Sequence, residues 1–168
     1  MNLSFTDDSD LWTKRFDALK TLAESQVDVG LTSSASGRSR FLMAIHEHGA
    51  PIMRIPPRPV VDPALAEDSA RSEMTAAMVS ALEAVMAGDP DGVTAALENC
   101  GKAGVAAIHD YMDGGVPPPN SPVTVSGGWI YNRVAKTGVL VKGKGFNKPL
   151  YDSGALYNDF DYEVKSRE

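Results

Sequence analysis

Two histidines, His46 and His48, flank Glu47 and are the residues best suited to binding a metal ion. On a helix, side chains two positions apart point to different sides, whereas two ligands of one ion need a spacing of three or four residues. On a strand the imidazoles would share a face, but the remaining histidine, His109, falls in a distant predicted helix, and one cysteine cannot complete a tetrahedral ligand set. We therefore expect no metal site, and we expect the imidazoles to bond to the proline-rich segment that follows.

Residues 138–144, GVLVKGK, match the first seven positions of the phosphate-binding loop G-x-x-x-x-G-K. The eighth position, where a hydroxyl would bind magnesium, is Gly145. The loop interior is strand-like, and the FNKP sequence that follows cannot open a helix whose N-terminus would hold a phosphate. The match therefore predicts no nucleotide site.

Nucleophilic catalysis has little support in the sequence. Cys100 falls on the apolar stripe of a predicted helix, where a cysteine is a small core residue rather than a reactive thiolate. No serine stands in a G-x-S-x-G turn, and spacing alone identifies no acid–base pair among the many acids. We expect a protein that is not an enzyme and uses no cofactor, with a metal-dependent enzyme using His46, His48 and an acid as the alternative.

Large aromatic and basic side chains are interleaved in a glycine- and proline-rich segment, residues 114–148. They are Trp129, Tyr131, Phe146, Arg133, Lys142 and Lys144. Aromatic and arginine side chains dominate protein interfaces, and single-stranded nucleic acid uses the same residue types. Because the net charge is -6, we expect contact with protein and no sequence-specific nucleic-acid binding. The remaining alternative is that this segment folds back on its own domain.

Hydrophobic periodicity predicts the elements that position these residues. Residues 8–24 should form a helix with one apolar stripe, which contains Leu11, Trp12, Phe16, Leu19 and Leu22. Residues 27–31 alternate as a strand, residues 40–48 form a short helix ended by Gly49 and Pro51, and prolines hold residues 55–61 extended.

Two Asp-Pro pairs predict the starts of two longer helices. Asp62 with Pro63 opens a helix that reaches Gly88, and Asp89 with Pro90 opens one that ends at residues 114–115. The two should form an antiparallel hairpin with an alanine- and methionine-rich contact face, and residues 129–134 and 139–141 should form a small β-hairpin within the arm. A turn and short helix at residues 150–156 should precede a terminal strand, 160–164, that pairs with residues 27–31.

These elements indicate a single α+β domain over residues 1–168. We expect a small antiparallel sheet packed against an N-terminal helix and a long helical hairpin, with residues 114–148 as an extended arm or loop. The 168 residues suit one core, and no apolar run approaches the roughly 20 residues of a membrane span. Without a signal-like N-terminus and with a single cysteine, we expect synthesis in the cytoplasm.

Charge is divided unevenly along the chain. Residues 62–98 carry eight acids and one base, Arg71, whereas residues 114–148 carry five bases and no acid. Unlike patches of this kind suit head-to-tail contacts between identical subunits. The alternative is two solvated faces that never meet.

Three segments resemble, in order, the signatures of the tailed-phage tail-completion or neck family, which includes the gene product 10 type proteins of lambdoid phages and the minor tail protein Z type. The matching residues are His46, Glu47 and Gly49; Pro57, Arg58 and Pro59; and Pro149, Leu150, Asp152, Ser153, Gly154 and Leu156. The three motifs cover roughly residues 27–164. The sequence departs from the family pattern at Val60, where phenylalanine is usual, and at His48, where an aromatic is common.

This resemblance implies a structural virion protein, made in the host cytoplasm, that forms a homo-oligomeric ring at the junction of tail and head. The ring is expected to be a hexamer. Its implied partners are a head-connector or head-completion protein on one side and a tail terminator or tail-tube protein on the other. A tail terminator that caps the tube is the alternative within the same class.

Two further expectations concern the arm and the proline-rich segment. The arm should be mobile in the free monomer and ordered in the ring, because its glycines and unopposed bases give it little reason to fold alone. Arg58 should fix residues 56–61 through a carboxylate, with Glu47 as the candidate.

Overall fold

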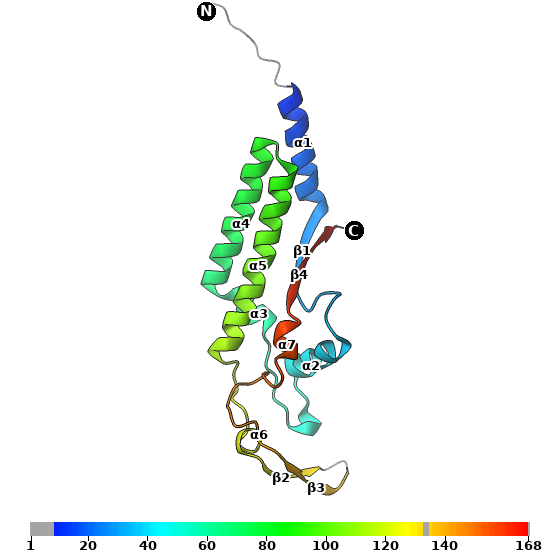
Figure 1. Ribbon diagram of the computed structural model, residues 1–168, viewed down its shortest axis with the longest axis vertical. Helices are drawn as coiled ribbons and strands as arrows, with labels where there is room; N and C mark the ends of the chain where they lie inside the picture. Colours follow the sequence, from blue (N-terminus) through cyan, green and yellow to red (C-terminus); the bar gives the residue numbers. More distant parts are fainter. Residues whose placement is uncertain (1–8, 133–134, 168) are drawn as a thin grey trace, which may run out of the picture.

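A computed structural model describes residues 9–132 and 135–167. The long axis of the molecule is set by α4 (Asp68–Ala87) and α5 (Pro90–Gly114), which lie side by side with α1 (Ser9–Glu24) against both (Figure 1). The Asp89 side chain accepts a hydrogen bond from the Gly92 N–H at 3.0 Å, and Pro90 occupies the first turn. Gly88 ends α4 with a φ of 71°. The predicted helical hairpin is confirmed.

A two-stranded antiparallel sheet, β1 (Ser25–Gly30) and β4 (Asp161–Ser166), packs on α5. Val27 lies opposite Val164 and Val29 opposite Tyr162, which confirms the predicted pairing of the two chain segments. Two buried glycines of α5, Gly101 and Gly104, face this sheet. A Cβ at Gly104 would lie 2.9 Å from the Val29 side chain, so the absence of side chains here lets the sheet approach the helix.

Adding a methyl group at Gly101 should therefore destabilise the fold. Its Cβ would lie 2.3 Å from Cδ2 and 2.9 Å from Cβ of Tyr162, so the strand itself would have to move. We expect Gly101→Ala to lower the free energy of unfolding by about 1–3 kcal/mol, measured by urea denaturation. Gly114→Ala is the control, because it lies in the same helix with nothing within 4 Å of the added Cβ. Equal stability of the two variants would contradict this packing.

The hydrophobic core has two parts. The upper part joins the helices to the sheet and is formed by Ala18, Val85, Val93 and Leu97. The lower part lies below the sheet, where the last turns of α5 meet α3 (Val61–Ala66) and α7 (Ala155–Asn158). Its buried residues are Val60, Ala64, Ile108, Met112, Val116, Leu156 and Phe160.

The predicted helix from Asp62 to Gly88 is wrong in two respects, because it is two helices and the first of them begins earlier than predicted. α3 begins at Val61, not after Asp62, and Glu67 has an extended ψ of 141° that separates α3 from α4. Val60 and Ala64 are fully buried in the lower core. The start of α3 therefore follows from the burial of Val60 and Ala64 rather than from the capping signal of Asp62.

The predicted apolar stripe of α1 is only partly buried, because Leu22 packs against the upper core whereas other stripe residues face solvent. Trp12 and Phe16 are 66% and 67% exposed, and the helix instead buries Ala18. On α4 the predicted contact stripe, which includes Met78, Ala81, Leu82 and Val85, is confirmed at Ala81 and Val85, which are buried, and wrong at Met78 and Leu82, which are exposed. Three of the four buried residues of α1 and α4 are alanines, whose small side chains let the helices approach closely.

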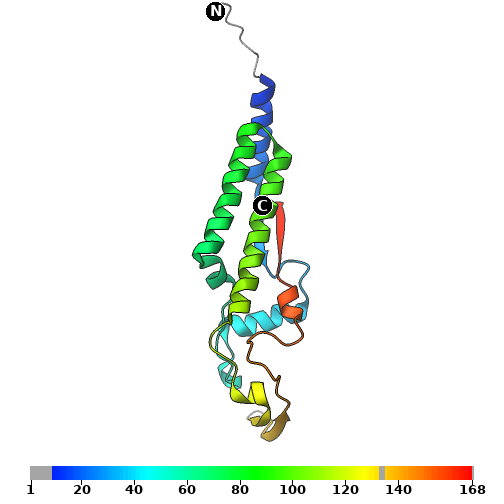
Figure 2. The ribbon, with the colours of Figure 1, turned by 60° about the vertical axis from the view of Figure 1, so that its left-hand side comes forward.

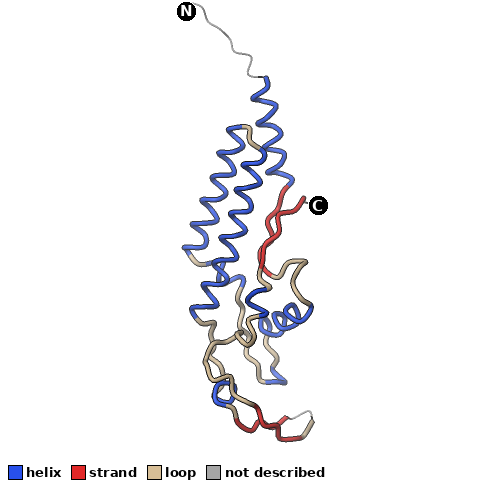
Figure 3. Tube along the Cα trace, in the orientation of Figure 1, coloured by secondary structure: helices blue, strands red, loops and turns tan. Residues whose placement is uncertain are grey.

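The remaining elements lie at the lower end of the molecule (Figure 1). α2 (Gly37–His48) stops before Gly49, as predicted, but it begins three residues earlier than predicted, after the Ser36 cap, and a short 3-10 helix, η1 (Pro51–Met53), follows. The arm contains α6 (Pro122–Ser126), β2 (Gly128–Asn132) and β3 (Thr137–Val141), and β2 and β3 form the predicted hairpin. Figures 2 and 3 show this hairpin at the end of the molecule opposite α1, joined to the body by loops. None of the described helices has the length and hydropathy that a membrane span requires.

Candidate functional site

The arm presents an apolar face that the described part of the chain leaves uncovered. Trp129 lies opposite Leu140 in the β2–β3 register and Tyr131 opposite Gly138, which places these side chains on one face of the hairpin. Trp129 is 72% exposed, and Tyr131 and Leu140 are each 65% exposed. Phe146, Lys136 and Lys142 are exposed as well. Arg133, the other predicted interface residue of the hairpin, lies outside the described residues.

The base of the hairpin is held by backbone hydrogen bonds. The N–H groups of Lys144 and Gly145 donate to the carbonyls of Thr124 and Val125, both at 2.9 Å. At the same place, Gly127 and Gly143 approach so closely that a Cβ on either would lie under 3 Å from the other's backbone. The hairpin is therefore an appended unit with a narrow, closed base.

Arg58 attaches the start of the arm to the body. Its side chain is 7% exposed, and it donates from Nε to the Pro118 carbonyl at 2.8 Å and from Nη2 to the Pro119 carbonyl at 3.1 Å. The expectation that Arg58 binds a carboxylate, with Glu47 as the candidate, is therefore wrong. Consecutive prolines have carbonyl acceptors but no N–H donors, so they form no ladder of their own and their carbonyls are available to a guanidinium.

His46 lies beside this attachment. Its carbonyl accepts a hydrogen bond from the Arg58 N–H at 2.5 Å, whereas its Nδ1 is buried and has no partner among the described residues. The expectation that the imidazoles bond to the proline-rich segment is therefore wrong at Nδ1 of His46, and the His46 backbone makes the contact instead. Burial, together with the nearby charges of Arg58 and Lys144, lowers the pKa of His46 below its ordinary value of 6.5.

The third motif closes the same region from the other end of the arm. Lys148 donates to Asp113 at 2.6 Å and lies 4.0 Å from the centre of the Tyr151 ring, and the Tyr157 hydroxyl donates to the other oxygen of Asp113 at 3.3 Å. The hydrogen bond from Lys148 lowers the pKa of the Asp113 carboxyl. Pro149 is buried, and Leu156 lies in the lower core.

The three motifs are thus brought together around the two ends of the arm, a region we call the arm root (residues 46–49, 57–59, 113–119 and 144–151). Gly49 belongs to it, because a Cβ there would lie 2.9 Å from the Ile55 carbonyl and the Pro57 nitrogen. Lys144 donates to the Tyr151 carbonyl and Lys148 to Asp113, so both side chains form contacts within the arm root. Lys144 was predicted as an interface residue, but it is not part of the exposed tip. Asp152 and Ser153 are exposed in the turn before α7, where Gly154 has a φ of 83°.

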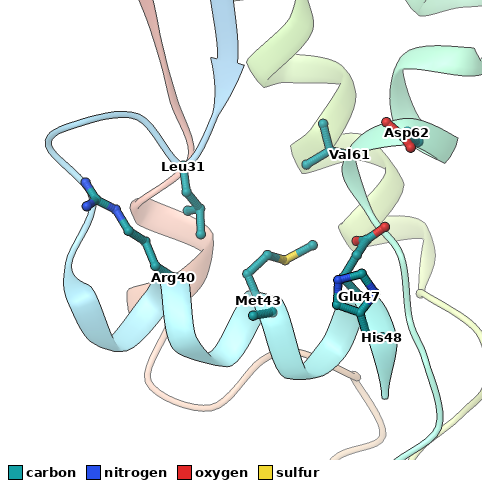
Figure 4. A pocket seen from close by; sticks show the side chains of 8 residues that line it. Leu31, Arg40, Met43, Glu47, His48, Val61 and Asp62 are labelled. Atoms are coloured by element: carbon teal, nitrogen blue, oxygen red, sulfur yellow. The ribbon is translucent and has the colours of Figure 1, made fainter. Parts of the chain in front are cut away.

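A shallow groove of about 390 Å³ lies beside the arm root (Figure 4). It is formed by the end of β1, one face of α2 and the start of α3. Leu31, Met43 and Val61 make its apolar part, with Arg40 at one end and Glu47, His48 and Asp62 at the other. Sequence reasoning did not identify this groove, because Leu31, Met43 and Val61 are far apart in the sequence and meet only where each packs against the lower core.

The histidines of α2 do not converge on one site. His46 lies within the electrostatic influence of Arg58 and Lys144, whereas His48 lines the groove with Glu47. Within residues 9–132 and 135–167, no three His, Cys, Asp or Glu side chains are grouped so that they could hold a metal ion. Cys100 is half-buried on α5, and burial raises the pKa of its thiol, which disfavours the reactive thiolate.

Comparison with known proteins gave no match to a family model, to a curated protein or to a solved structure.

The burial of His46 predicts a loss of stability on acidification. Because its pKa is lowered in the fold, the unfolded chain takes up a proton that the folded chain refuses, so stability falls as pH drops below about 6.5. We expect His46→Gln to lose less thermal stability than the natural chain between about pH 7 and pH 5, where carboxylates titrate little. His48→Gln is the control, because His48 is exposed. An unchanged pH dependence in His46→Gln would contradict this assignment.

Proposed function

We propose that this chain is a structural virion protein that completes the head-proximal end of a phage tail and joins the tail to the head connector. The observation that carries the proposal is the projecting arm, whose tip exposes Trp129, Tyr131 and Leu140 beside lysines. Exposed aromatic side chains on an appended hairpin are suited to burial against another protein. The proposal is supported by the resemblance of three motifs to the tail-completion family, because residues of all three surround the root of this arm.

In this role the chain forms a homo-oligomeric ring, which we propose to be a hexamer. One side of the ring contacts a head-connector or head-completion protein, and the other contacts a tail terminator or tail-tube protein. The arm root fixes where the arm leaves each subunit, and the exposed face of the hairpin contacts the partner. The protein would act in the virion, at the tail–head junction, after synthesis in the host cytoplasm.

The test is to remove this gene from the phage that encodes it and to supply variants from a plasmid. Without the protein we expect filled heads beside free tails of normal length, counted by electron microscopy. Trp129→Ala should restore few joined particles, whereas Phe41→Ala should restore them fully, because Phe41 is a 66% exposed aromatic on α2, outside the arm. Normal joining without the protein would refute the proposal, and tails of uncontrolled length would instead indicate a terminator that caps the tube.

A further inference from the structure

We infer that the groove beside the arm root receives the β2–β3 hairpin of a second copy of this chain. This inference rests on the proposed ring and names the contact that builds it. The Trp129 face of the hairpin would lie on the apolar part of the groove, and Lys142 would lie near Glu47 and Asp62.

The groove has the chemistry of such a receptor. Figure 4 shows Met43 between Leu31 and Val61, with the Glu47 and Asp62 carboxylates together at one end. Neither carboxylate forms an ion pair with any described residue. Arg40, at the opposite end, is held by the carbonyls of Thr32 and Ser33 at 2.8 and 2.7 Å. An incoming group therefore meets apolar surface with unneutralised acid at one edge.

The hairpin carries the complementary features. Trp129, Tyr131 and Leu140 share one face of the hairpin, and Lys142 lies just past the end of β3, two residues after Leu140. Lys136 and Lys142 are exposed and form no ion pair with a described residue. Apolar side chains edged by lysine thus match an apolar groove edged by acid.

A second copy is the occupant because the chain's own hairpin leaves the groove open. In both ribbon views the hairpin extends away from α2 (Figures 1 and 2), and its aromatic side chains remain exposed. The arm root holds it there through Arg58 and Lys144. Because hairpin and groove are different surfaces of one chain, their contact is head-to-tail, and repeating it generates a ring when the rotation closes. Charge alone would also allow the basic arm to contact the acids of α4 and α5. The groove differs from them because it offers an apolar surface for Trp129 as well as acids.

Mixed cysteine variants test this contact between copies. In a Cys100→Ala background, chains with Leu140→Cys are mixed with chains carrying Met43→Cys and are oxidised mildly. We expect a cross-linked dimer, since residue 140 lies opposite Trp129 on the docking face. Phe41→Cys is the matched control, because Phe41 is an exposed residue of the same helix that does not line the groove. No dimer, or equal yields for positions 41 and 43, would overturn the inference.

Charge exchange gives a second test that keeps Trp129. Lys142→Glu should lower the yield of cross-linked dimer about fivefold or more, and Asp62→Lys in the partner chain should restore it. Glu73→Lys, a change of another exposed acid on α4, should not restore it. If none of these changes affects the yield, the inference is wrong. If the cross-link fails while the protein still joins tails to heads, the inference fails and the proposed function stands.

Discussion

Replacing residues 129–141 with two glycines should leave the body folded and reduce head-joined particles by about tenfold or more. The hairpin contributes nothing to either buried core cluster, and its base is already closed by the approach of Gly127 to Gly143. The thermal stability of the body should therefore change little. The loss of joining follows because central aromatic side chains at interfaces contribute about 2 kcal/mol or more each.

The measurement compares thermal unfolding of the purified chain with electron-microscopic counts of joined particles in the same complementation experiment. The double variant Trp129→Ala, Tyr131→Ala keeps the hairpin backbone and removes only its aromatic side chains. It therefore distinguishes loss of the interface from loss of the hairpin itself. A shortened chain that joins heads and tails normally would remove the hairpin from the mechanism. A shortened chain that unfolds would show that the hairpin is part of the body.

Arg58→Ala should cause the largest loss of stability among single changes at the arm root. The change removes two hydrogen bonds from a charged, buried group and leaves the Pro118 and Pro119 carbonyls without these donors. We expect a loss of about 2–4 kcal/mol, and a melting temperature lower by about 5–15 °C. The arm should also be released, so that proteases cleave within residues 116–148 sooner than in the natural chain.

Two controls accompany this change. Arg58→Lys keeps the charge but loses the planar donor pair, so its stability should lie between those of the natural chain and Arg58→Ala. Arg38→Ala removes an exposed arginine of α2 and should change melting temperature little. If Arg58→Ala melts and is cleaved like the natural chain, Arg58 does not attach the arm.

Local chain chemistry was enough to predict much of the fold. The Asp89-Pro90 pair and Gly88 determine where one helix ends and the next begins, and alternation in residues 27–31 and 160–164 identifies strands that do pair. These signals act within a few residues and do not depend on distant contacts. The β-hairpin in the arm was predictable for the same reason.

The errors arise where distant parts of the chain decide the outcome. Trp12 and Phe16 form an obvious apolar stripe, yet Ala18 is buried because a small residue permits close helix packing. Arg58 binds carbonyls some sixty residues away, a partner that no spacing rule suggests. The groove was missed for the same reason, since Met43 and Val61 come together because both pack against the lower core. By contrast, the arm and its aromatic residues could be identified from composition alone.

The native mass of the full-length chain in solution tests most directly the claim that its arm builds a ring. Native mass spectrometry should show one closed oligomer, expected to be a hexamer, when the chain is concentrated or mixed with the tail-tube protein that we propose as a partner. The chain lacking residues 129–141 should remain monomeric under the same conditions. Two results would contradict the account: a monomer under all conditions, or a shortened chain that forms an oligomer with the same number of subunits as the natural chain.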